Sequence, residues 1–577
     1  LDNHRGITLL PTLSKIYVKC LMHRINVWAK SKNLICDIQC AAQAKCSSLH
    51  SSWLTRETIA TRTDLGKTTH VAMLDIRKCF DSLWHEGILY KLHEIGLRGK
   101  VWRIINLMYK DFKCRVMVNG AYSGGDDFPI LRGIHQGAPC SMFLFMVFIN
   151  DLLKKLQDVP FGIKIGEYAL SCIAYADDLT LIASCKTDLQ MMVDIAHSYS
   201  LQWHFRFNPT KCVVMVFGKD HEGDMSVTMG GHTLKVVASE SHLGSVLATK
   251  NSEEHRYIER RITECQKMCY ASLSIGSQAV PVTPTVLSKL YISACIPKLC
   301  YGTEVMDIDD TSLDSMESFQ AKNAKLFQNL PQNTCNIGAV TTIGWTSIQA
   351  QIDIKRLILL WQILLLPMDS LYKKVIIYLI FQPKERHSGP LYKMMSTCER
   401  YGILNFVYES VLNASFISIA QWKKMIKHLV ITRHNKNICR SYFMYESLSQ
   451  AMSFTLYTKI NSWWIYATMC PWETRKISLV IRLLLKTCRL GRAKLGNGSS
   501  DSIAHILFSC PMNRDSKMTL WKPVIDVSPP KLAEELNSMS DEKRTIFILN
   551  SFNCDYMSDW HIVYEKTLFY LYNVHKL

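Results

Sequence analysis

The chain has 577 residues, 48% hydrophobic and 20% charged, which excludes a chain too polar to bury real cores. The net charge of +18 favours a polyanionic partner, with nucleic acid the leading class. The 21 irregularly spaced cysteines argue against a disulfide framework and for a reduced, intracellular protein. No apolar run is long enough to span a membrane, and the length suggests roughly three or four domains. Since the first residue is Leu1 rather than Met, we expect an upstream part to be missing.

The first informative stretch runs from residue 70 to residue 92. A short apolar strand is predicted at residues 71–74, ending at Asp75, and an amphipathic helix follows. Catalytic carboxylates often stand at such strand ends. Asp81 could compete for that role, although it is more simply a helix N-cap, with Ser82 as the alternative cap.

A glycine-containing loop precedes a long apolar helix between residues 131 and 153. Gly133 and Gly137 bracket Gln136, and Pro139 and Ser141 come before the helix. Such a loop allows a backbone to approach a flat or charged ligand closely. Gly-Pro loops before helices are also common in purely structural roles.

Two adjacent carboxylates, Asp177 and Asp178, lie within the apolar stretch "SCIAYADDLTLIASC". The pattern predicts a β-hairpin with strands at residues 173–176 and 179–183 and with Asp177-Asp178 as the tight turn. Burying unpaired charges costs several kcal/mol or more. A divalent cation such as Mg²⁺ would offset the repulsion, while the alternative is an ordinary surface turn.

In combination these segments resemble a known family. "LDIRKCFD", "RGIHQGAPCS" and "AYADD" look like motifs A, B and C of the reverse transcriptases of LINE-type, non-LTR retrotransposons. Residues 2–25 resemble the element that opens the polymerase in that family, residues 207–218 resemble motif D, and residues 241–247 resemble the motif E hairpin. The resemblance covers residues 1–247.

The resemblance implies an α+β fold, the right-hand polymerase with fingers, a palm built on an antiparallel sheet, and a thumb. Partial fingers would occupy residues 1–66, and the palm with interleaved fingers residues 67–247, so that the reverse transcriptase domain is 1–247 overall. A helical thumb would follow at 248–340 and a mainly helical, basic region at 341–577.

The resemblance also implies the catalytic residues Asp75, Asp177 and Asp178, which would hold two Mg²⁺ ions together with the backbone carbonyl of Ile76. Asp75 and Asp177 would bridge the metals most directly. Phe80 would pack beneath the sugar and disfavour a 2′-hydroxyl. The remaining nucleotide-binding residues would be Arg5, Gln136, Gly137 and Lys211, and each cation could instead be a solvated surface residue.

The sequence departs from the family pattern at several positions. Gly6 replaces the usual proline after Arg5, and Met142 follows Ser141 where proline is common. The Gln-x-Gly-Phe element of the family has no Gly-Phe here, and Gln39 or Gln43 could be its glutamine. His242 stands where a tyrosine usually precedes Leu-Gly. None of these changes removes a metal ligand.

Beyond residue 247 the patterns are weaker. Residues 253–270 predict a thumb helix with Ile258, Ile262, Cys265 and Cys269 on one face. Its cations Arg256, Arg260, Arg261 and Lys267 are candidates for contacts with a nucleic-acid backbone, or are simply solvated. The acid-free basic stretches 421–440 and 474–500 suit RNA or DNA contacts.

Aromatic residues near the basic stretches could stack on bases or form a core; they are Trp463, Trp464, Tyr466 and Trp472. His505 and Cys510 resemble half of a family zinc site. The expected upstream Cys-x2-Cys pair is absent, so we expect no working zinc site.

The implied activity is RNA-directed DNA polymerisation for retrotransposition. The partners would be an RNA template, a DNA primer or target and deoxynucleoside triphosphates, without a membrane, in the nucleus and cytoplasm. The alternative is an inactive or repurposed nucleic-acid-binding protein on the same fold.

Overall fold

The computed structural model describes residues 7–41, 43–110, 112–118, 121–122, 127–218, 225–275, 282–382, 387–445, 460–485, 503–504, 507–508, 514–549 and 560–576. They form two compact units that do not follow chain order. Unit 1 comprises Leu1–Glu254, Glu304–Asp307 and Arg356–Ile419, and unit 2 comprises His255–Thr303, Ile308–Lys355 and Ala420–Leu577. None of the helices in these described ranges is long and apolar enough to cross a membrane.

A five-stranded sheet with the order β13-β10-β1-β9-β8 lies at the centre of unit 1. Its neighbouring strands are antiparallel, except that β13 runs parallel to β10. All six residues of β1 are buried, as expected for a central strand covered on both faces. The strands are β1 (Thr69–Leu74), β8 (Cys172–Tyr175), β9 (Asp178–Ala183), β10 (Val213–Phe217) and β13 (Lys235–Val236).

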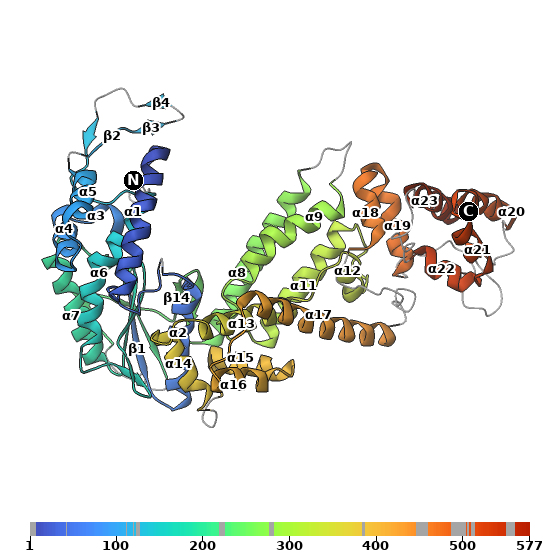
Figure 1. Ribbon diagram of the computed structural model, residues 1–577. Coiled ribbons are helices and arrows are strands. Elements are labelled where there is room, and N and C mark those ends of the chain that lie inside the picture. Colours follow the sequence, from blue (N-terminus) through green and yellow to red (C-terminus); the bar gives the residue numbers. More distant parts are fainter. Residues whose placement is uncertain are drawn as a thin grey trace. The chain divides into compact units, whose positions relative to one another are not determined.

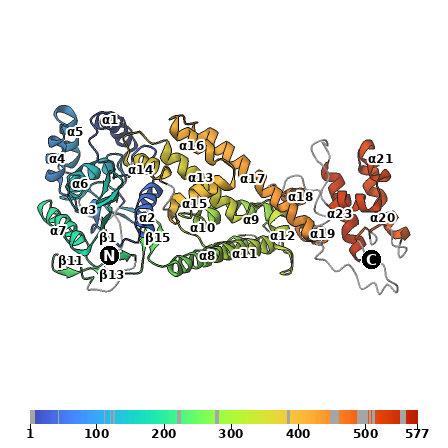
Figure 2. The ribbon, with the colours of Figure 1, turned by 90° about the horizontal axis from the view of Figure 1, so that it is seen from below.

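Two helices cover one face of this sheet. The chain runs β1, α6 (Ser141–Gln157), β8, β9, α7 (Lys186–Gln202), β10, which is the split βαβ arrangement with two crossover helices on one side. Side chains from α6 and α7 share one apolar core with alternate residues of the strands, such as Ala72, Leu181 and Val214. Helix α2 (Ser48–Asp64) contacts β1 and β8 from the opposite face (Figures 1 and 2).

Distant segments of the chain complete unit 1 by packing on α2. The buried Glu57 carboxylate accepts a hydrogen bond from the Leu391 backbone N–H at 2.8 Å. The Asp64 carboxylate accepts one from the Ser388 hydroxyl at 2.7 Å. Gly389 has a φ of +92°, and a Cβ added there would lie 2.7 Å from the Ala60 Cβ, so a side chain would not fit without a shift. The helices brought in from this part of the chain are α14 (Leu371–Ile380), α15 (Gly389–Arg400) and α16 (Leu404–Leu412).

The remaining elements of unit 1 are the 20-residue helix α1, three shorter helices and pairs of short strands. They are α1 (Thr12–Ser31), α3 (Cys79–Ser82), α4 (His85–Glu94), α5 (Gly99–Tyr109), β2 (Lys113–Cys114), β3 (Met117–Val118), β4 (Ala121–Tyr122), β5 (Phe128–Pro129), β6 (Ile163–Ile165), β7 (Tyr168–Leu170), β11 (Thr228–Met229), β12 (His232–Thr233), β14 (Ser239–His242) and β15 (Ser245–Ala248).

The described residues of unit 2 form helices joined by turns, without strands. Helix α8 (Asn251–Leu273) begins in unit 1 and continues into unit 2, and α13 (Ile348–Leu364) and α17 (Ile419–Met444) also span a unit boundary. The other elements are α9 (Pro284–Leu290), the π-helix η1 (Tyr291–Cys295), α10 (Ile296–Leu299), α11 (Asp310–Phe327), α12 (Asn336–Thr342), α18 (Ser462–Met469), η4 (Pro471–Glu473), α19 (Thr474–Leu484), α20 (Arg514–Val527), α21 (Pro530–Ser538), α22 (Asp541–Leu549) and α23 (Trp560–Lys576). The expected α+β class with a mainly helical C-terminal region is confirmed.

Three buried histidines make the stability of unit 1 sensitive to acid. Burial lowers the pKa of His50 and of His135 to about 4 and that of His242 to about 3. An unfolded histidine titrates near pH 6.5, so below that pH the unfolded state binds protons that the folded state does not. The stability that depends on neutral histidines is therefore present above pH 6.5 and is lost as the pH falls towards 4. We expect thermal unfolding midpoints to fall across this window.

The variant His135→Phe tests the contribution of one ring. His135 stacks on Tyr109 with ring centroids 4.9 Å apart and contacts Phe112 at 4.0 Å, so an apolar ring suits the site. The variant should reduce the pH dependence of the unfolding free energy by up to about 1.4 kcal/mol per pH unit. His232→Phe, at an exposed position, is the control. A pH dependence in His135→Phe equal to that of the parent would contradict the prediction.

Candidate active site

The register between β1 and β9 brings the first and second carboxylate segments together. Leu74, the last residue of β1, pairs with Leu179, so the chain direction carries Asp75 level with Asp178. Both carboxylates therefore stand at the same edge of the central sheet. The predicted strand that ends at Asp75 is confirmed.

The hairpin turn differs by one residue from the prediction. Tyr175 pairs with Asp178, so Ala176 and Asp177 form the two-residue turn and Asp178 is already the first residue of β9. Ala176 has a φ of +54°, a left-handed conformation that costs an L-residue roughly 1–2 kcal/mol. This shift separates the two carboxylates, because Asp177 belongs to the turn and Asp178 to the strand.

Asp177 and Asp178 accordingly line two adjoining pockets. The larger pocket has a volume of about 830 Å³ and is lined by Asp75 and Asp177, whereas the smaller, of about 370 Å³, is lined by Asp75 and Asp178. Thr210 and Lys211 also belong to both. Most predicted site residues line the larger pocket, namely Asp75, Ile76, Phe80, Gln136, Gly137, Asp177 and Lys211.

The end of β1 is held by the segment before β10. The Asn208 N–H donates to the Asp75 carbonyl at 2.8 Å, and the Arg77 N–H donates to the Arg206 carbonyl at 2.9 Å. The Asp75 N–H donates to the buried Cys212 thiol at 3.4 Å, and burial raises the pKa of that thiol to about 11, so it stays protonated. Hydrogen bonds to both the N–H and the carbonyl of Asp75 thus fix its main chain.

The glycine loop is fixed against the segment that follows Asp75. The N–H groups of Gly133 and Ile134 donate to the carbonyls of Leu83 at 2.8 Å and Phe80 at 2.7 Å. Gly133 has a φ of +93°, and a Cβ there would lie 2.9 Å from the Asp81 backbone, so the close approach requires glycine.

Two side chains of the larger pocket are positioned by this loop packing. The Phe80 ring is half-buried against Phe145, with centroids 5.8 Å apart. The Gln136 amide donates to the Asp81 carboxylate at 3.0 Å. Asp81 lies inside α3 and lines the pocket, so its interpretation as an N-cap is wrong; Lys78 caps α3 and Trp84 precedes α4.

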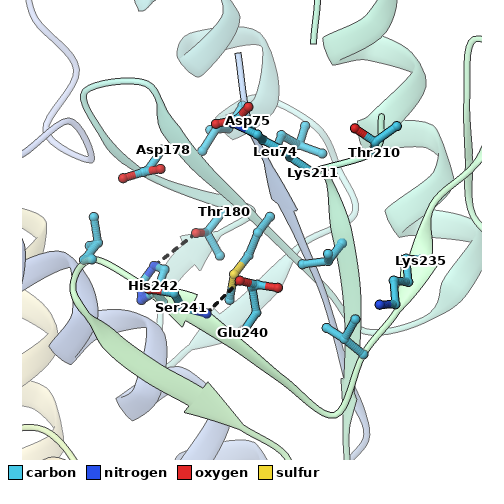
Figure 3. A pocket seen from close by; sticks show the side chains of 15 residues that line it. Leu74, Asp75, Asp178, Thr180, Thr210, Lys211, Lys235, Glu240, Ser241 and His242 are labelled. Atoms are coloured by element: carbon cyan, nitrogen blue, oxygen red, sulfur yellow. Dashed lines mark hydrogen bonds between the residues drawn. The ribbon is translucent and has the colours of Figure 1, made fainter. Parts of the chain in front are cut away.

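The hairpin β14–β15 closes the smaller pocket (Figure 3). His242, which stands in place of the family's tyrosine, turns inward, and its Nε2 lies 3.3 Å from the hydroxyl of Thr180 in β9. Burial, and secondarily the nearby Arg56, lower the pKa of His242, so the ring is neutral. The imidazole therefore joins the hairpin to β9 rather than facing the carboxylates with a charge.

The donor set fits a hard cation. Within the described residues, no three side chains of His, Cys, Asp or Glu lie close enough together to form a metal cage by themselves. Mg²⁺ does not need one, since it is usually held by one or two carboxylates with substrate phosphates completing its shell. Asp75, Asp177 and Lys211, which all line the larger pocket, suit such an arrangement.

The sequence does not predict two residues that hold Asp75, and three predicted residues lie outside the described part of the chain. Asn208 and Cys212 carry no signal in the sequence, because the Asn208 N–H and the Cys212 thiol act through hydrogen bonds to the Asp75 main chain, which only the fold brings near. Arg5, His505 and Cys510 lie outside the described residues.

In α8 the predicted helix is confirmed. Ile258, Cys265 and Cys269 are buried, but Arg261 turns inward, stacks on Tyr257 at 4.6 Å and donates to the Tyr301 carbonyl. The exposed cations of this helix are Arg256, Arg260 and Lys267.

The basic stretch in α17 does not form one stripe. At 100° per residue, Lys423, Lys424 and Lys427 lie on one side of the helix and the later cations on the opposite side, namely Arg433, Lys436 and Arg440. A single straight duplex could not contact all six.

The nearby aromatic residues are mostly core. Trp463, Trp464 and Tyr466 are buried, which excludes base stacking on them, whereas Trp472 is 69% exposed. Of the second basic stretch, residues 486–500 lie outside the described residues.

Comparison with known proteins shows which family this region resembles. Residues 1–258 match the family described as "Reverse transcriptase (RNA-dependent DNA polymerase)". The RNA-directed DNA polymerase from mobile element jockey of Drosophila melanogaster is 23% identical over 341 residues, covering 57% of this chain and 36% of that protein. A Pol polyprotein from the type-1 retrotransposable element R2 of Popillia japonica is 33% identical over 185 residues, covering 31% and 25%.

The chain thus spans about a third or less of the length of these relatives. Apo telomerase from Candida tropicalis aligns over 71% of this chain and 61% of its own with 12% identity and a TM-score of 0.33, a likeness too low to support any assignment. The family is generally Mg²⁺-dependent. The family match and the site together identify residues 1–258 as a reverse transcriptase domain with the right-hand palm, related to the reverse transcriptases of non-LTR retrotransposons.

Proposed function

We propose that the chain is an RNA-directed DNA polymerase that extends a DNA 3′-hydroxyl on an RNA template during retrotransposition, in the nucleus and cytoplasm. The observation that carries this proposal is the convergence of Asp75, Asp177 and Asp178 at one sheet edge, between two pockets that share Lys211. Paired carboxylates at such an edge suit phosphoryl transfer, in which most of the catalysis is positioning and charge stabilisation.

The chain's own residues divide the work between the pockets. When bound, two Mg²⁺ ions would activate the primer hydroxyl and neutralise the leaving pyrophosphate. Asp75 and Asp177 would hold them from the wall of the larger pocket, with Asp178 contributing from the smaller one. The incoming triphosphate would occupy the larger pocket, where Lys211 offers a cation and Gln136 and Gly137 offer a wall next to the base.

The decisive test is primer extension by the full chain on poly(rA)–oligo(dT) with Mg²⁺. Asp177→Asn should lower the rate roughly a thousandfold, because several kcal/mol of metal-dependent stabilisation are lost. Salt-sensitive binding of the template–primer should remain. Asp158→Asn, at the exposed end of α6 and outside both pockets, is the matched control. No extension by the parent, with binding retained, would instead support an inactive nucleic-acid-binding protein.

Because the turn is offset by one residue, we expect Asp177 and Asp178 to contribute unequally to the rate of primer extension. Asp178 is exposed and lines only the smaller pocket, while Asp177 lines the larger one. Asp178→Asn should therefore retain at least roughly tenfold more activity than Asp177→Asn. Equal loss in the two variants, measured as kcat on the same substrate, would refute this division.

Phe80 is proposed to exclude the 2′-hydroxyl. Phe80→Val should lower the preference for dTTP over UTP, measured as the ratio of kcat/KM values, by roughly tenfold or more, because the ring that would clash is removed. Phe145→Leu is the control, since it weakens the packing of the same ring from the buried side without opening the pocket. An unchanged ratio in Phe80→Val would rule out Phe80 as the sugar gate.

A further inference from the structure

A buried primary amide lies against the turn that carries Asp177. The Gln39 side chain is fully buried, and its Oε1 accepts hydrogen bonds from the N–H groups of Ala176 at 2.9 Å and Ala41 at 3.2 Å. Its Nε2 donates to the Ala176 carbonyl at 3.2 Å. Two N–H donors on one atom fix which end of the amide is oxygen. One side chain thus binds both polar groups of a single residue of the turn.

The main chain around Gln39 is tied to the same hairpin. The Ala174 N–H donates to the Ile38 carbonyl and the Cys40 N–H donates to the Ala174 carbonyl, each at 3.2 Å. Gln39 and Ala174 form a parallel bridge at the open edge of β8. This backbone pairing therefore places the Gln39 side chain next to the turn.

This segment is anchored from behind by α14. The Tyr372 hydroxyl, buried in unit 1, donates to the Ile38 carbonyl at 3.3 Å and lies 3.4 Å from the Ser51 hydroxyl. A residue more than 300 positions later in the chain thus supports the segment that carries Gln39. A rigid support of this kind is what a precisely placed ligand requires.

The turn has a physical need for such a partner. Ala176 holds a φ of +54°, which only glycine adopts without strain, and its N–H and C=O lie outside the ladder that pairs Tyr175 with Asp178. Without Gln39, either polar group would be buried without a partner or the turn would relax to another conformation. Relaxation would move Asp177, the next residue.

We propose that Gln39 is a positioning residue, which locks the Ala176–Asp177 turn so that the Asp177 carboxylate faces the larger pocket. The inference rests on the proposed function for its catalytic consequence, although its structural content concerns Asp177 alone. Among the standard side chains only glutamine and asparagine carry a primary amide, which places an N–H donor beside a carbonyl acceptor, and asparagine is one methylene shorter.

The test uses the full chain with two readouts: Mg²⁺ dependence of primer extension, and binding of Mn²⁺ alone measured by electron paramagnetic resonance. Gln39→Met fills the same space but binds neither group of Ala176. We expect it to raise the metal concentration for half-maximal extension and the Kd for Mn²⁺ roughly tenfold each, with KM for template–primer unchanged. Asp177→Asn gives the reference for a lost ligand.

Two further variants separate positioning from stability. Gln43→Met is the matched control, because Gln43 lies in the same segment and donates to the Gln39 and Cys36 carbonyls without contacting the turn. Ala176→Gly removes the strain of the positive φ, so adding it to Gln39→Met should restore most of the metal binding. If Gln39→Met does not fold, Gln39→Asn, with the same amide on a shorter stem, should show the same metal defect.

The outcomes are distinct. Parental metal dependence in Gln39→Met or Gln39→Asn, with the parent extending primers, would overturn the role of Gln39 and leave the polymerase intact. An equal defect with and without Ala176→Gly would also overturn it. If the parent extends no primer but its Mn²⁺ binding requires both Asp177 and Gln39, the proposed function fails and the positioning role stands.

Discussion

The site depends on the pairing of β1 with β9. This register sets Leu74 opposite Leu179 and so carries Asp75 level with Asp178. A slip of one residue would reverse which side chains of β9 face the helices, because the side-chain period of a strand is two. Leu181 and Ala183 then could not join the core formed with α6 and α7, so burial of apolar side chains enforces the position of the carboxylates.

The loops next to the carboxylates are held mainly by backbone hydrogen bonds. Asn208 holds the end of β1, and Gly133 ties the glycine loop before α6 to the link between α3 and α4. Backbone contacts of this kind place few demands on side chains, except where a Cβ would collide, as at Gly133. The departures from the family pattern, such as His242, are tolerated for a related reason: the neutral imidazole finds a partner in Thr180 and carries no charge into the site.

The face of the sheet opposite α6 and α7 is covered by α2, and segments distant in the chain pack on that helix. Helix α15 packs on α2 through a hydrogen bond to the buried Glu57 carboxylate and the close contact at Gly389. Tyr372 of α14 reaches the segment that carries Gln39. Residues 356–419 therefore belong to the same compact unit as Asp75, Asp177 and Asp178, although they lie far beyond the resemblance to motifs A to E. Substitutions in residues 356–419 can therefore alter the site by changing this packing.

The sequence by itself determined the kinds of residue at the site, because the chemistry needs carboxylates at a strand end and a hairpin, glycines in a tight loop, and an aromatic ring after Asp75. Strand β1, helix α6 and the hairpin were readable from local patterns, since burial imposes a period on apolar residues. The turn was misplaced by one residue, because Asp-Asp and Ala-Asp turns differ locally by little and the choice depends on pairing with β1. Only the tertiary structure decided that Asp177 and Asp178 line different pockets, that Arg261, Trp463 and Trp464 are buried, and that Gln39 contacts Ala176. These outcomes rest on contacts between residues distant in the chain, which local patterns do not encode.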